Sequence, residues 1–401
     1  MKLKNPFRRI CGGVALLSFV FMFPHHAMAQ QHGPSWLDPQ RPLEAAQAYQ
    51  DHLQTNHGTT VSGLINAQSQ MFMKSPEHEG KGRSSTYYWL QINQCLWTGA
   101  CVSAEVEGGW GSGLDRLMET YSILNGNAGE PSPLYIPKVY LTQSLLNERL
   151  VLYAGKLDLS SWFDLNDVAN SSDIQFLSSA LVYNLAIPFP ENGLGMMAEF
   201  NLSEQLYVQA GMSDAGAVST HTGFDTAFEG DAKAFSLAEL GWCPAIRDQP
   251  GHYRFILWHD QRELPRFDDD GDEAGHAGFA LSFDQGLNDV LTLFCRYGYE
   301  DPDVYTIEHF WSCGAQLAKI LSARPNDMAG LAMAQSILSP DYRGSSEPRP
   351  EPSETLYEAY YSIAINDYVT LTPVVQCIHH PLGEADADEV VTGGARLVLA
   401  F

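Results

Sequence analysis

Most of the chain alternates apolar and polar residues at every second position. In residues 391–401 one side carries Val391, Gly393, Ala395, Leu397, Leu399 and Phe401, and the other carries Thr392, Gly394, Arg396, Val398 and Ala400. Successive side chains of a β-strand point to opposite faces, so this spacing predicts a strand with one apolar face. Residues 149–159, 289–299 and 354–365 show the same pattern.

The alternation predicts sixteen strands of about 10 to 14 residues. They are expected at residues 59–72, 83–93, 100–109, 135–145, 149–159, 193–202, 205–214, 232–243, 251–260, 275–284, 289–299, 310–321, 328–338, 354–365, 368–379 and 391–401.

The connections alternate in length as well. Short connections, such as 247–251, 284–289 and 322–327, are followed by long polar ones at 259–274, 300–309, 339–353 and 380–390. Short and long connections are therefore expected at opposite ends of the sheet.

Long strands of even number, apolar on one face and polar on the other, favour an all-β fold in which an antiparallel barrel crosses a membrane. A soluble sandwich has strands of about 5 to 6 residues and lacks such a difference between its two ends. Closing the barrel requires the last strand to pair with the first, which places Phe401 in the aromatic girdle at the membrane interface. Both chain ends are then expected on the periplasmic side, with the long loops outside.

The chain divides into three predicted segments. Residues 1–29 have the basic start, the apolar run "VALLSFVFMF" and the small-residue end of a secretory signal peptide. That run is too short for a membrane-spanning helix. Residues 30–58 are expected to be periplasmic and to contain a short helix at 42–54, and residues 59–401 form the barrel.

The longest connection, 160–192, follows the fifth strand. It contains Trp162, Phe163, Phe176, Tyr183 and Phe189 but few charges. That much apolar surface is not expected in a loop exposed to solvent. We therefore expect this loop to fold inward and narrow the barrel.

The net charge excludes nucleic acid as a partner, and the cysteine spacing allows one disulfide. Removal of residues 1–29 takes away four basic residues and no acids, so the formal net charge changes from −25 to −29. Such a chain repels nucleic acid, and its 45% hydrophobic content indicates a folded protein. Cys95 and Cys101 are close enough to pair across a hairpin in an oxidising compartment, or they stay unpaired. Four further cysteines are interpreted as small hydrophobes, at Cys243, Cys295, Cys313 and Cys377.

Several segments resemble the carbohydrate-selective porins of the OprB type. They are residues 154–195, 253–305, 310–318 ("FWSCGAQLA"), 324–334 ("RPNDMAGLAMA") and 354–378, in that order along the chain. The resemblance implies a sixteen-stranded outer-membrane barrel of a Gram-negative bacterium that lets sugars diffuse into the periplasm, with the loop after the fifth strand in the constriction. Two features depart from the family: cysteines stand where alanine or aromatic residues are expected, and the chain is strongly acidic where the family has a constriction rich in arginine.

Alternation predicts which charges face the lumen, because a Lys or Arg facing lipid at mid-bilayer costs about 2 to 4 kcal/mol. The predicted pore-lining residues are Glu105, Glu107, Lys138, Lys156, Asp158, Arg254, Arg296, Glu358 and Arg396. The aromatic residues Trp162, Phe163, Trp258 and Tyr360 are expected to stack on sugar rings. Alternatively, the charges only hydrate the lumen and pair with each other. Four acids against five bases predict a nearly neutral constriction and a mild preference for cations that arises at the mouth.

No other chemistry is expected. Residues 267–273 ("FDDDGDE") lack the spacing of a calcium-binding EF-hand and are interpreted as a solvated loop tip, bridged by divalent ions to lipopolysaccharide. No metal site, cofactor or catalytic motif is predicted. The alternatives are a general, weakly cation-selective porin without sugar preference and, less favoured, an outer-membrane phospholipase using His276. The expected partners are sugars, outer-membrane lipid and lipopolysaccharide; association into a homotrimer, as in many porins, stays open.

Overall fold

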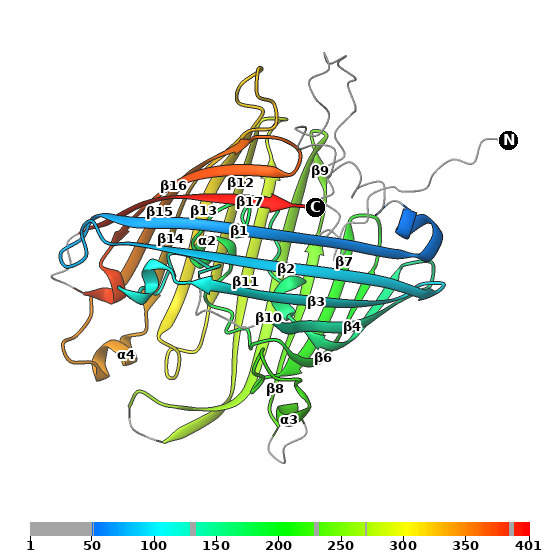
Figure 1. Ribbon diagram of the computed structural model, residues 1–401. Coiled ribbons are helices and arrows are strands. Elements are labelled where there is room, and N and C mark those ends of the chain that lie inside the picture. Colours follow the sequence, from blue (N-terminus) through cyan, green and yellow to red (C-terminus); the bar gives the residue numbers. More distant parts are fainter. Residues whose placement is uncertain (1–49, 51, 129–133, 228–231, 269–270, 385–388) are drawn as a thin grey trace.

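A computed structural model of the protein shows sixteen antiparallel strands closed into one barrel (Figure 1). The structure describes residues 50, 52–128, 134–227, 232–268, 271–384 and 389–401. The signal peptide expected at 1–29 and most of the helix expected at 42–54 lie outside these residues; residues 52–57 are helical. None of the described helices is both long and apolar enough to cross a membrane.

The sixteen wall strands follow the predicted pattern closely. They are β1 (Thr59–Lys74), β2 (Gly82–Trp97), β3 (Ala100–Gly111), β4 (Tyr135–Leu145), β5 (Leu150–Leu157), β6 (Gly193–Asn201), β7 (Leu206–Asp214), β8 (Ala234–Trp242), β10 (Gln249–Pro265), β11 (Asp272–Gly286), β12 (Leu291–Tyr299), β13 (Ile307–Ala318), β14 (Met328–Leu338), β15 (Ser353–Ala364), β16 (Val369–His379) and β17 (Val390–Ala400). A two-residue strand, β9 (Ala245–Ile246), pairs with β10 inside the turn that follows β8.

Besides the helical residues 52–57, short helices lie in the connections between strands in the described part of the chain. They are η1 (Leu114–Arg116), η2 (Leu159–Ser161), α2 (Ser179–Val182), α3 (Phe224–Ala227), α4 (Pro340–Ser345) and η3 (Pro381–Gly383).

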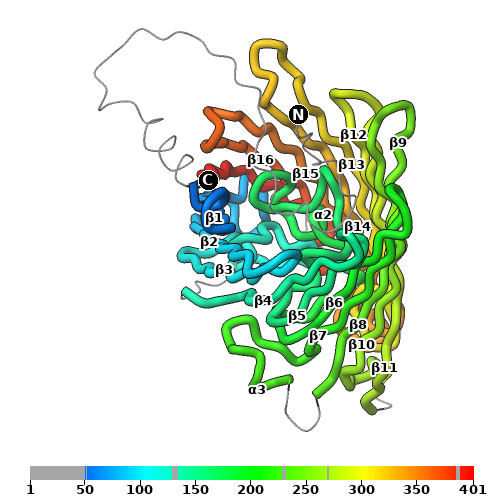
Figure 2. The backbone as a smooth tube through the Cα atoms, turned by 90° about the vertical axis from the view of Figure 1, so that its right-hand side faces the viewer, coloured from blue at the N-terminus to red at the C-terminus, as the bar shows by residue number. Residues whose placement is uncertain are grey.

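The last strand closes the barrel against the first, as predicted. β17 pairs with β1 from Leu64↔Ala400 to Lys74↔Val391. Gly63 and Phe401 then exchange two backbone hydrogen bonds of 3.0 Å, and the Phe401 ring covers Gly63 so closely that a Cβ at residue 63 would lie 2.7 Å from the ring. Both views show the C-terminus beside β1 (Figures 1 and 2).

The two ends of the barrel differ as the connection lengths predict. One end has connections of two to nine residues, at 98–99, 146–149, 202–205, 243–248, 287–290, 319–327 and 365–368. The other has connections of six to 35 residues, at 75–81, 112–134, 158–192, 215–233, 266–271, 300–306, 339–352 and 380–389. One expectation is corrected. The long connection predicted at 259–274 is mostly paired strand, since β10 and β11 stay paired out to Pro265↔Asp272, with a shift of register between Asp260 and Glu263.

The outer face of the wall is apolar. Leu257, Leu331 and Val375 are 52%, 66% and 45% exposed there. Near the end with short turns, Tyr253 packs against the rings of Trp242 and Phe283, as in an interfacial aromatic girdle.

Two loops pack inside the barrel and form a core with its wall. We call residues 158–192 the inward loop, and residues 112–128 the second loop. Their buried side chains, among them Leu114, Leu124 and Phe176, join wall residues such as Phe294 and Leu356 in one apolar cluster, and Figure 1 shows α2 of the inward loop within the ring of strands. The inward folding of the loop after the fifth strand is confirmed.

Candidate functional site in the barrel lumen

Arg296 fastens the inward loop to β12. Its side chain is fully buried, and its guanidinium Nε lies 3.0 Å from Asp164 Oδ2. The two terminal nitrogens donate to the backbone carbonyls of Leu181, at 3.0 Å, and Asp164, at 2.9 Å. Arg296 faces inward as predicted, but it binds the loop instead of lining open water.

Arg396 and Glu358 hold a neighbouring part of the same loop. Arg396, from β17, donates to the carbonyls of Ser172, at 2.5 Å, and Gln175, at 2.8 Å. Glu358, from β15, accepts from the amides of Leu177, at 2.5 Å, and Ser178, at 3.0 Å. These two predicted lumen residues therefore satisfy backbone groups of the inward loop, which would otherwise be buried without partners.

The second loop is held in the same way, which the sequence analysis did not predict. Glu354 of β15 accepts from the amides of Ser122, at 2.7 Å, and Tyr121, at 3.1 Å. The two loops also bond to each other, since the amide of Gly126 donates to Leu177 O at 3.0 Å. The β15–β17 wall and both loops thus form one hydrogen-bonded unit.

The predicted sugar-stacking aromatic residues are buried. Trp162 and Phe163 are 5% and 1% exposed, and the Trp162 ring packs between Tyr140 and Tyr153 at 5.3 Å from each centroid. Trp258 and Tyr360 are equally buried, at 2% and 4%. All four rings pack the loop against the wall, so none of them offers a free face to a sugar in this structure.

Lys156 corrects the face assignment of β5. It lies in register with Val139, which is 40% exposed, whereas its neighbour Gly155 lies opposite Tyr140, which faces the lumen. Its amino group donates to the carbonyl of Ile136 on β4 and to the carbonyls of Ser219 and His221 in the connection between β7 and β8. The sequence pattern assigns Lys156 to the lumen because charges are expected on the inward face of every strand. The inward face of β5 is apolar instead, because it packs against the inward loop.

Arg254 pairs within the wall. Its Nη1 lies 3.1 Å from Asp284 Oδ2 on β11. Asp284 also accepts from the His252 ring at 2.6 Å, and the His252 ring lies 3.4 Å from the carboxylate of Asp167 in the inward loop. This set of residues could offer ligands to a cation, but the direct contact with the Arg254 guanidinium favours an ion-pair network.

The least filled part of the lumen borders β2, β3 and β4. Inward side chains on β10 to β17 are mostly buried by the loops, whereas Tyr87, Trp89, Lys138 and Tyr140 are partly exposed. Across from them the inward loop presents Tyr183, which is 37% exposed. We infer that the remaining passage runs between this wall and the inward loop.

A set of charged and phenolic groups surrounds this passage. Lys138 Nζ lies 2.9 Å from Glu105 Oε1, and Glu107 accepts from the hydroxyls of Tyr87, at 2.5 Å, and Tyr135. Glu105 lies opposite Lys138 and Glu107 lies opposite Trp89 on the inward faces of β2 to β4, and Asp173 of the inward loop accepts from the side-chain amide of Asn66 on β1 at 2.9 Å. We call this set the constriction: Tyr87, Trp89, Glu105, Glu107, Tyr135, Lys138, Asp158, Asp173 and Tyr183.

The charges around the constriction differ from those predicted. It holds the four acids Glu105, Glu107, Asp158 and Asp173 together with Lys138, while Arg396 also acts on Asp173; the near-neutral constriction therefore stays a prediction. The cancellation had relied on Lys156, Arg254, Arg296 and Arg396, which the structure assigns to other contacts. Five members of the constriction were not predicted as site residues: Tyr87, Trp89, Tyr135, Asp173 and Tyr183. Only the aromatic content of the loop gave a signal for Tyr183.

Asp158 has a structural role as well. Its carboxylate caps η2 by accepting from the Ser160 amide at 3.0 Å. In the second loop, Asp115 accepts from the Leu124 amide at 2.8 Å, and burial raises its pKa to about 6.

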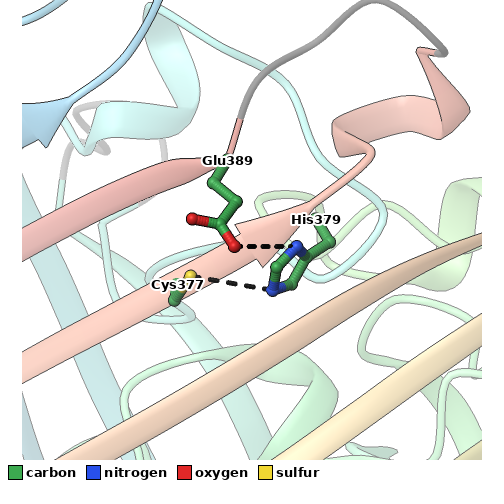
Figure 3. Close-up of side chains that lie close together, drawn as sticks. All are labelled: Cys377, His379 and Glu389. Atoms are coloured by element: carbon green, nitrogen blue, oxygen red, sulfur yellow. Dashed lines mark hydrogen bonds and ion pairs between the residues drawn. The ribbon is translucent and has the colours of Figure 1, made fainter.

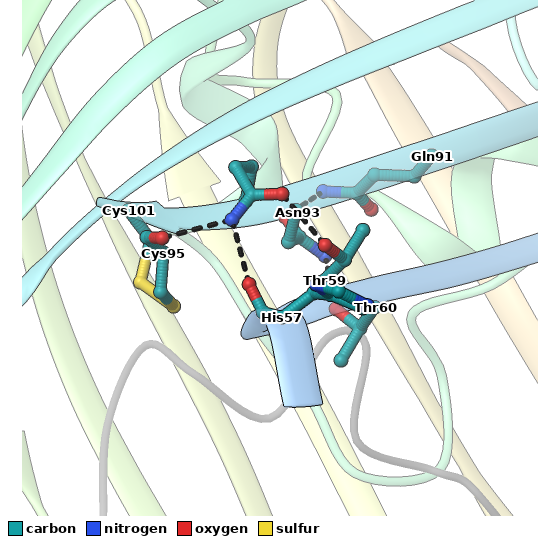
Figure 4. The surroundings of a disulfide bond; sticks show 8 residues. His57, Thr59, Thr60, Gln91, Asn93, Cys95 and Cys101 are labelled. Atoms are coloured by element: carbon teal, nitrogen blue, oxygen red, sulfur yellow. Dashed lines mark hydrogen bonds between the residues drawn. A yellow bond between two sulfur atoms is a disulfide. The ribbon is translucent and has the colours of Figure 1, made fainter. Parts of the chain in front are cut away.

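The disulfide between Cys95 and Cys101, which the sequence allows but does not decide, is present. Cys95 and Cys101 are bonded across the β2–β3 hairpin, at the end with short turns (Figure 4). Beside it, Gln94 Nε2 donates to the carbonyls of His57 and Cys95, both at 2.9 Å, which ties the start of β1 to this hairpin.

Two further hypotheses from the sequence concern His276 as a lipase residue and the acidic loop tip at 267–273. His276 is 2% exposed and faces the lumen, where Nε2 lies 2.8 Å from Glu273 O. It is not on the outer wall, where a lipase would need it. In the acidic tip at 267–273, of which residues 269–270 lie outside the described residues, Arg266 contacts Asp268 and Glu273 and reaches Asp303 at 2.9 Å.

Comparison with known proteins agrees with this architecture. The sequence profile described as "Carbohydrate-selective porin, OprB family" matches residues 97–401. Porin AaxA of Chlamydia abortus is 24% identical over 227 residues, which are 57% of this chain and 49% of that protein. Porin B of Pseudomonas aeruginosa is 22% identical over 253 residues, covering 53% of this chain and 56% of that protein. The chain thus spans about half the length of these curated relatives.

A solved structure shows the same fold. The structure titled "High pH structure of Pseudomonas putida OprB" superposes with a TM-score of 0.78 at 15% identity, covering 89% of this chain and 97% of that one.

Proposed function

The chain belongs to the OprB family of carbohydrate-selective porins, and from this membership we propose that it is a passive channel through which sugars cross the outer membrane. Its narrowest passage is the constriction between the inward loop and strands β2 to β4. The transported solutes, the pore-lining residues and the selectivity are parts of this proposal.

One observation supports the proposal most strongly: an exposed tyrosine stands opposite charged hydrogen-bonding groups. Tyr183 of the inward loop is 37% exposed, and we place it across the lumen from the partly exposed Lys138 and Glu107 of the β3–β4 wall. A sugar presents an apolar ring face and a rim of hydroxyl groups. An aromatic ring accommodates the face, while an ammonium group and carboxylates bind the hydroxyls. Such contacts are weak enough individually to let the solute leave again.

The four carboxylates of the constriction support a second property, which is preference for cations over anions. Water confined between low-dielectric walls screens a fixed charge less than bulk water does. Four carboxylates beside the Lys138 ammonium group therefore act on a passing ion even where salt screens the outer loops. A general cation-preferring porin without sugar binding is the second candidate for this reason.

Planar bilayers separate the two candidates. A sugar channel is blocked in part when the preferred sugar occupies the constriction, so single-channel conductance falls as sugar is added. We expect Tyr183→Ala to raise the half-blocking sugar concentration several-fold, and Tyr183→Phe, which keeps the ring, to raise it less. Equal half-blocking concentrations in all three proteins, each with heat-modifiable gel migration, would contradict the sugar-binding role of Tyr183. Conductance unaffected by any sugar would favour the general porin.

Association of three barrels is a separate expectation. Chemical crosslinking in detergent followed by gel electrophoresis without boiling measures it. A band at three times the chain mass would support a homotrimer, and a single-chain band alone would contradict it.

A further inference from the structure

A cysteine, a histidine and a glutamate meet on the outer face of the barrel, at the end with the long loops. Cys377 and His379 are two residues apart near the end of β16, and Glu389 directly precedes β17 (Figure 3). Cys377 Sγ lies 4.0 Å from His379 Nε2, and His379 Nδ1 lies 3.4 Å from Glu389 Oε1. One ligand atom from each residue lies within 4.8 Å of the other two.

The β16–β17 hairpin holds these three residues in place. Cys377 and His379 share a face because side chains alternate along a strand. Their intermediate neighbour Ile378 pairs with Val390, so Glu389 comes opposite His379 in the same register. The Tyr357 ring, on the adjacent strand, packs edge-on against the imidazole at 5.7 Å. Because the ligands stand on paired backbone, little ordering is needed to bring them together.

We propose that these three residues bind a zinc ion, with water as the fourth ligand. Zinc takes sulfur at about 2.3 Å and nitrogen or oxygen at about 2.0 to 2.2 Å in a tetrahedron, so ligand atoms stand roughly 3.3 to 3.7 Å apart. The separations of 4.0 and 3.4 Å join different nitrogens of the His379 ring, and a zinc ion takes only one of them. With one nitrogen counted, the three ligand atoms lie within 4.8 Å of one another, so rotation of the partly exposed Cys377 and the exposed Glu389 side chains is needed to reach zinc distances. A thiolate, an imidazole and a carboxylate together suit zinc better than magnesium or calcium, which prefer oxygen ligands alone.

The site is accessible, and one competing cation is nearby. Cys377 and His379 are partly exposed and Glu389 is exposed. Lys74, at the end of β1, lies 3.7 Å from the other carboxylate oxygen of Glu389. A bound zinc ion would replace this ammonium as the charge partner of Glu389. It would also join the end of β16 to the start of β17, next to the seam where β17 meets β1.

No metal site is predicted from the sequence, because the three ligands are not spaced as in known zinc motifs. Cys377 and His379 alone are two ligands, and Glu389 follows ten residues after His379. Only the strand register brings the third ligand into place.

Cobalt(II) is the probe, because a cysteine thiolate bound to it gives a near-ultraviolet charge-transfer band. The full chain is purified in detergent with its thiols reduced, stripped with a chelator and titrated with cobalt(II). Zinc is then added to displace the cobalt. We expect one equivalent of cobalt per chain, with the band lost in Cys377→Ser and at least tenfold weaker binding in His379→Gln.

Two variants sharpen the test. Cys295→Ser removes another cysteine of the outer face, one that lies opposite Cys313 and away from this site, and should leave the titration unchanged. Lys74→Met removes a positive charge near 4 Å from a ligand and should tighten binding about fivefold. The proposal is overturned if the wild type gives no band, if the band survives in Cys377→Ser, or if it is lost in Cys295→Ser. Gel migration with and without heating verifies that each variant is folded.

Discussion

Replacing Arg296 by methionine should release the inward loop from the barrel wall. Arg296 is fully buried and makes its contacts with Asp164 and Leu181, both in the inward loop. Methionine fills part of the same volume but donates no hydrogen bond. Asp164, which is 2% exposed, is left as a buried carboxylate without its cation.

The expected magnitude follows from that orphaned charge. Removing one partner of a buried ion pair costs about 3 to 5 kcal/mol. Since each 1.4 kcal/mol is a factor of ten, the population of detached loops rises roughly 100- to 4,000-fold. The barrel itself should persist, because its strands are hydrogen-bonded to each other around the full ring.

Single-channel recording and limited proteolysis measure the detachment. In planar bilayers we expect Arg296→Met to show more frequent steps to a higher conductance than the wild type. A protease added to the protein in detergent should cut within residues 158–192 faster. Arg262→Met is the control, because the ion pair of Arg262 is with Asp260 of the same strand.

A double variant identifies the cause. Arg296→Met combined with Asp164→Asn has no orphaned charge and should recover part of the wild-type behaviour. The reasoning is refuted if Arg296→Met, folded by gel migration, gives the conductance pattern and cleavage rate of the wild type.

Three further predictions concern charge, pH and the disulfide. Glu107→Gln removes one carboxylate of the constriction and should lower the cation-to-anion permeability ratio roughly tenfold, since a unit charge about 6 Å away in water attracts a cation by about 0.7 kcal/mol and repels an anion by as much; an unchanged reversal potential in a salt gradient would contradict this. Burial raises the pKa of Asp115 from 3.8 to about 6, so its stabilising contribution is present below pH 3.8 and is lost as pH rises through about 6. Hydrogen-exchange protection of the Gly126 amide, which joins the second loop to Leu177 of the inward loop, should therefore fall across this range in the wild type, and a fall of equal size in Asp115→Asn would exclude this carboxyl as the cause. Replacing Cys95 and Cys101 by serine opens a short loop and should cost about 2 kcal/mol, seen as a lower temperature of conversion on heat-modifiability gels; an unchanged temperature would show that the bond does not limit stability.

The strands could be predicted from the sequence because lipid imposes a strict rule on the outer face. Every second residue from Leu291 to Tyr299 is compatible with lipid or its interface, and any shift by one residue would turn Arg296 outward. The strands expected at 135–145 and 328–338 match the structure residue for residue.

The inner face obeys no such rule, which is why the site was predicted less well. A lumen residue faces water in one place and a packed loop in another, and alternation cannot distinguish the two. Arg296 and Glu358 were placed on the correct face, but their partners are backbone groups more than 100 residues away in sequence. On β5 the presence of the loop makes the inner face apolar, and the rule that charges face the lumen then fails for Lys156.

The position of Arg396 has a consequence for assembly. This residue belongs to the final strand of the ring, yet it binds Ser172 and Gln175, which precede it by more than 200 residues. The inward loop cannot acquire this anchor until β17 has taken its place beside β1, and contacts so distant in sequence form late in folding. Narrowing of the pore is thereby coupled to completion of the wall, so a barrel that is still open at its seam has a plug that is not yet fully fastened.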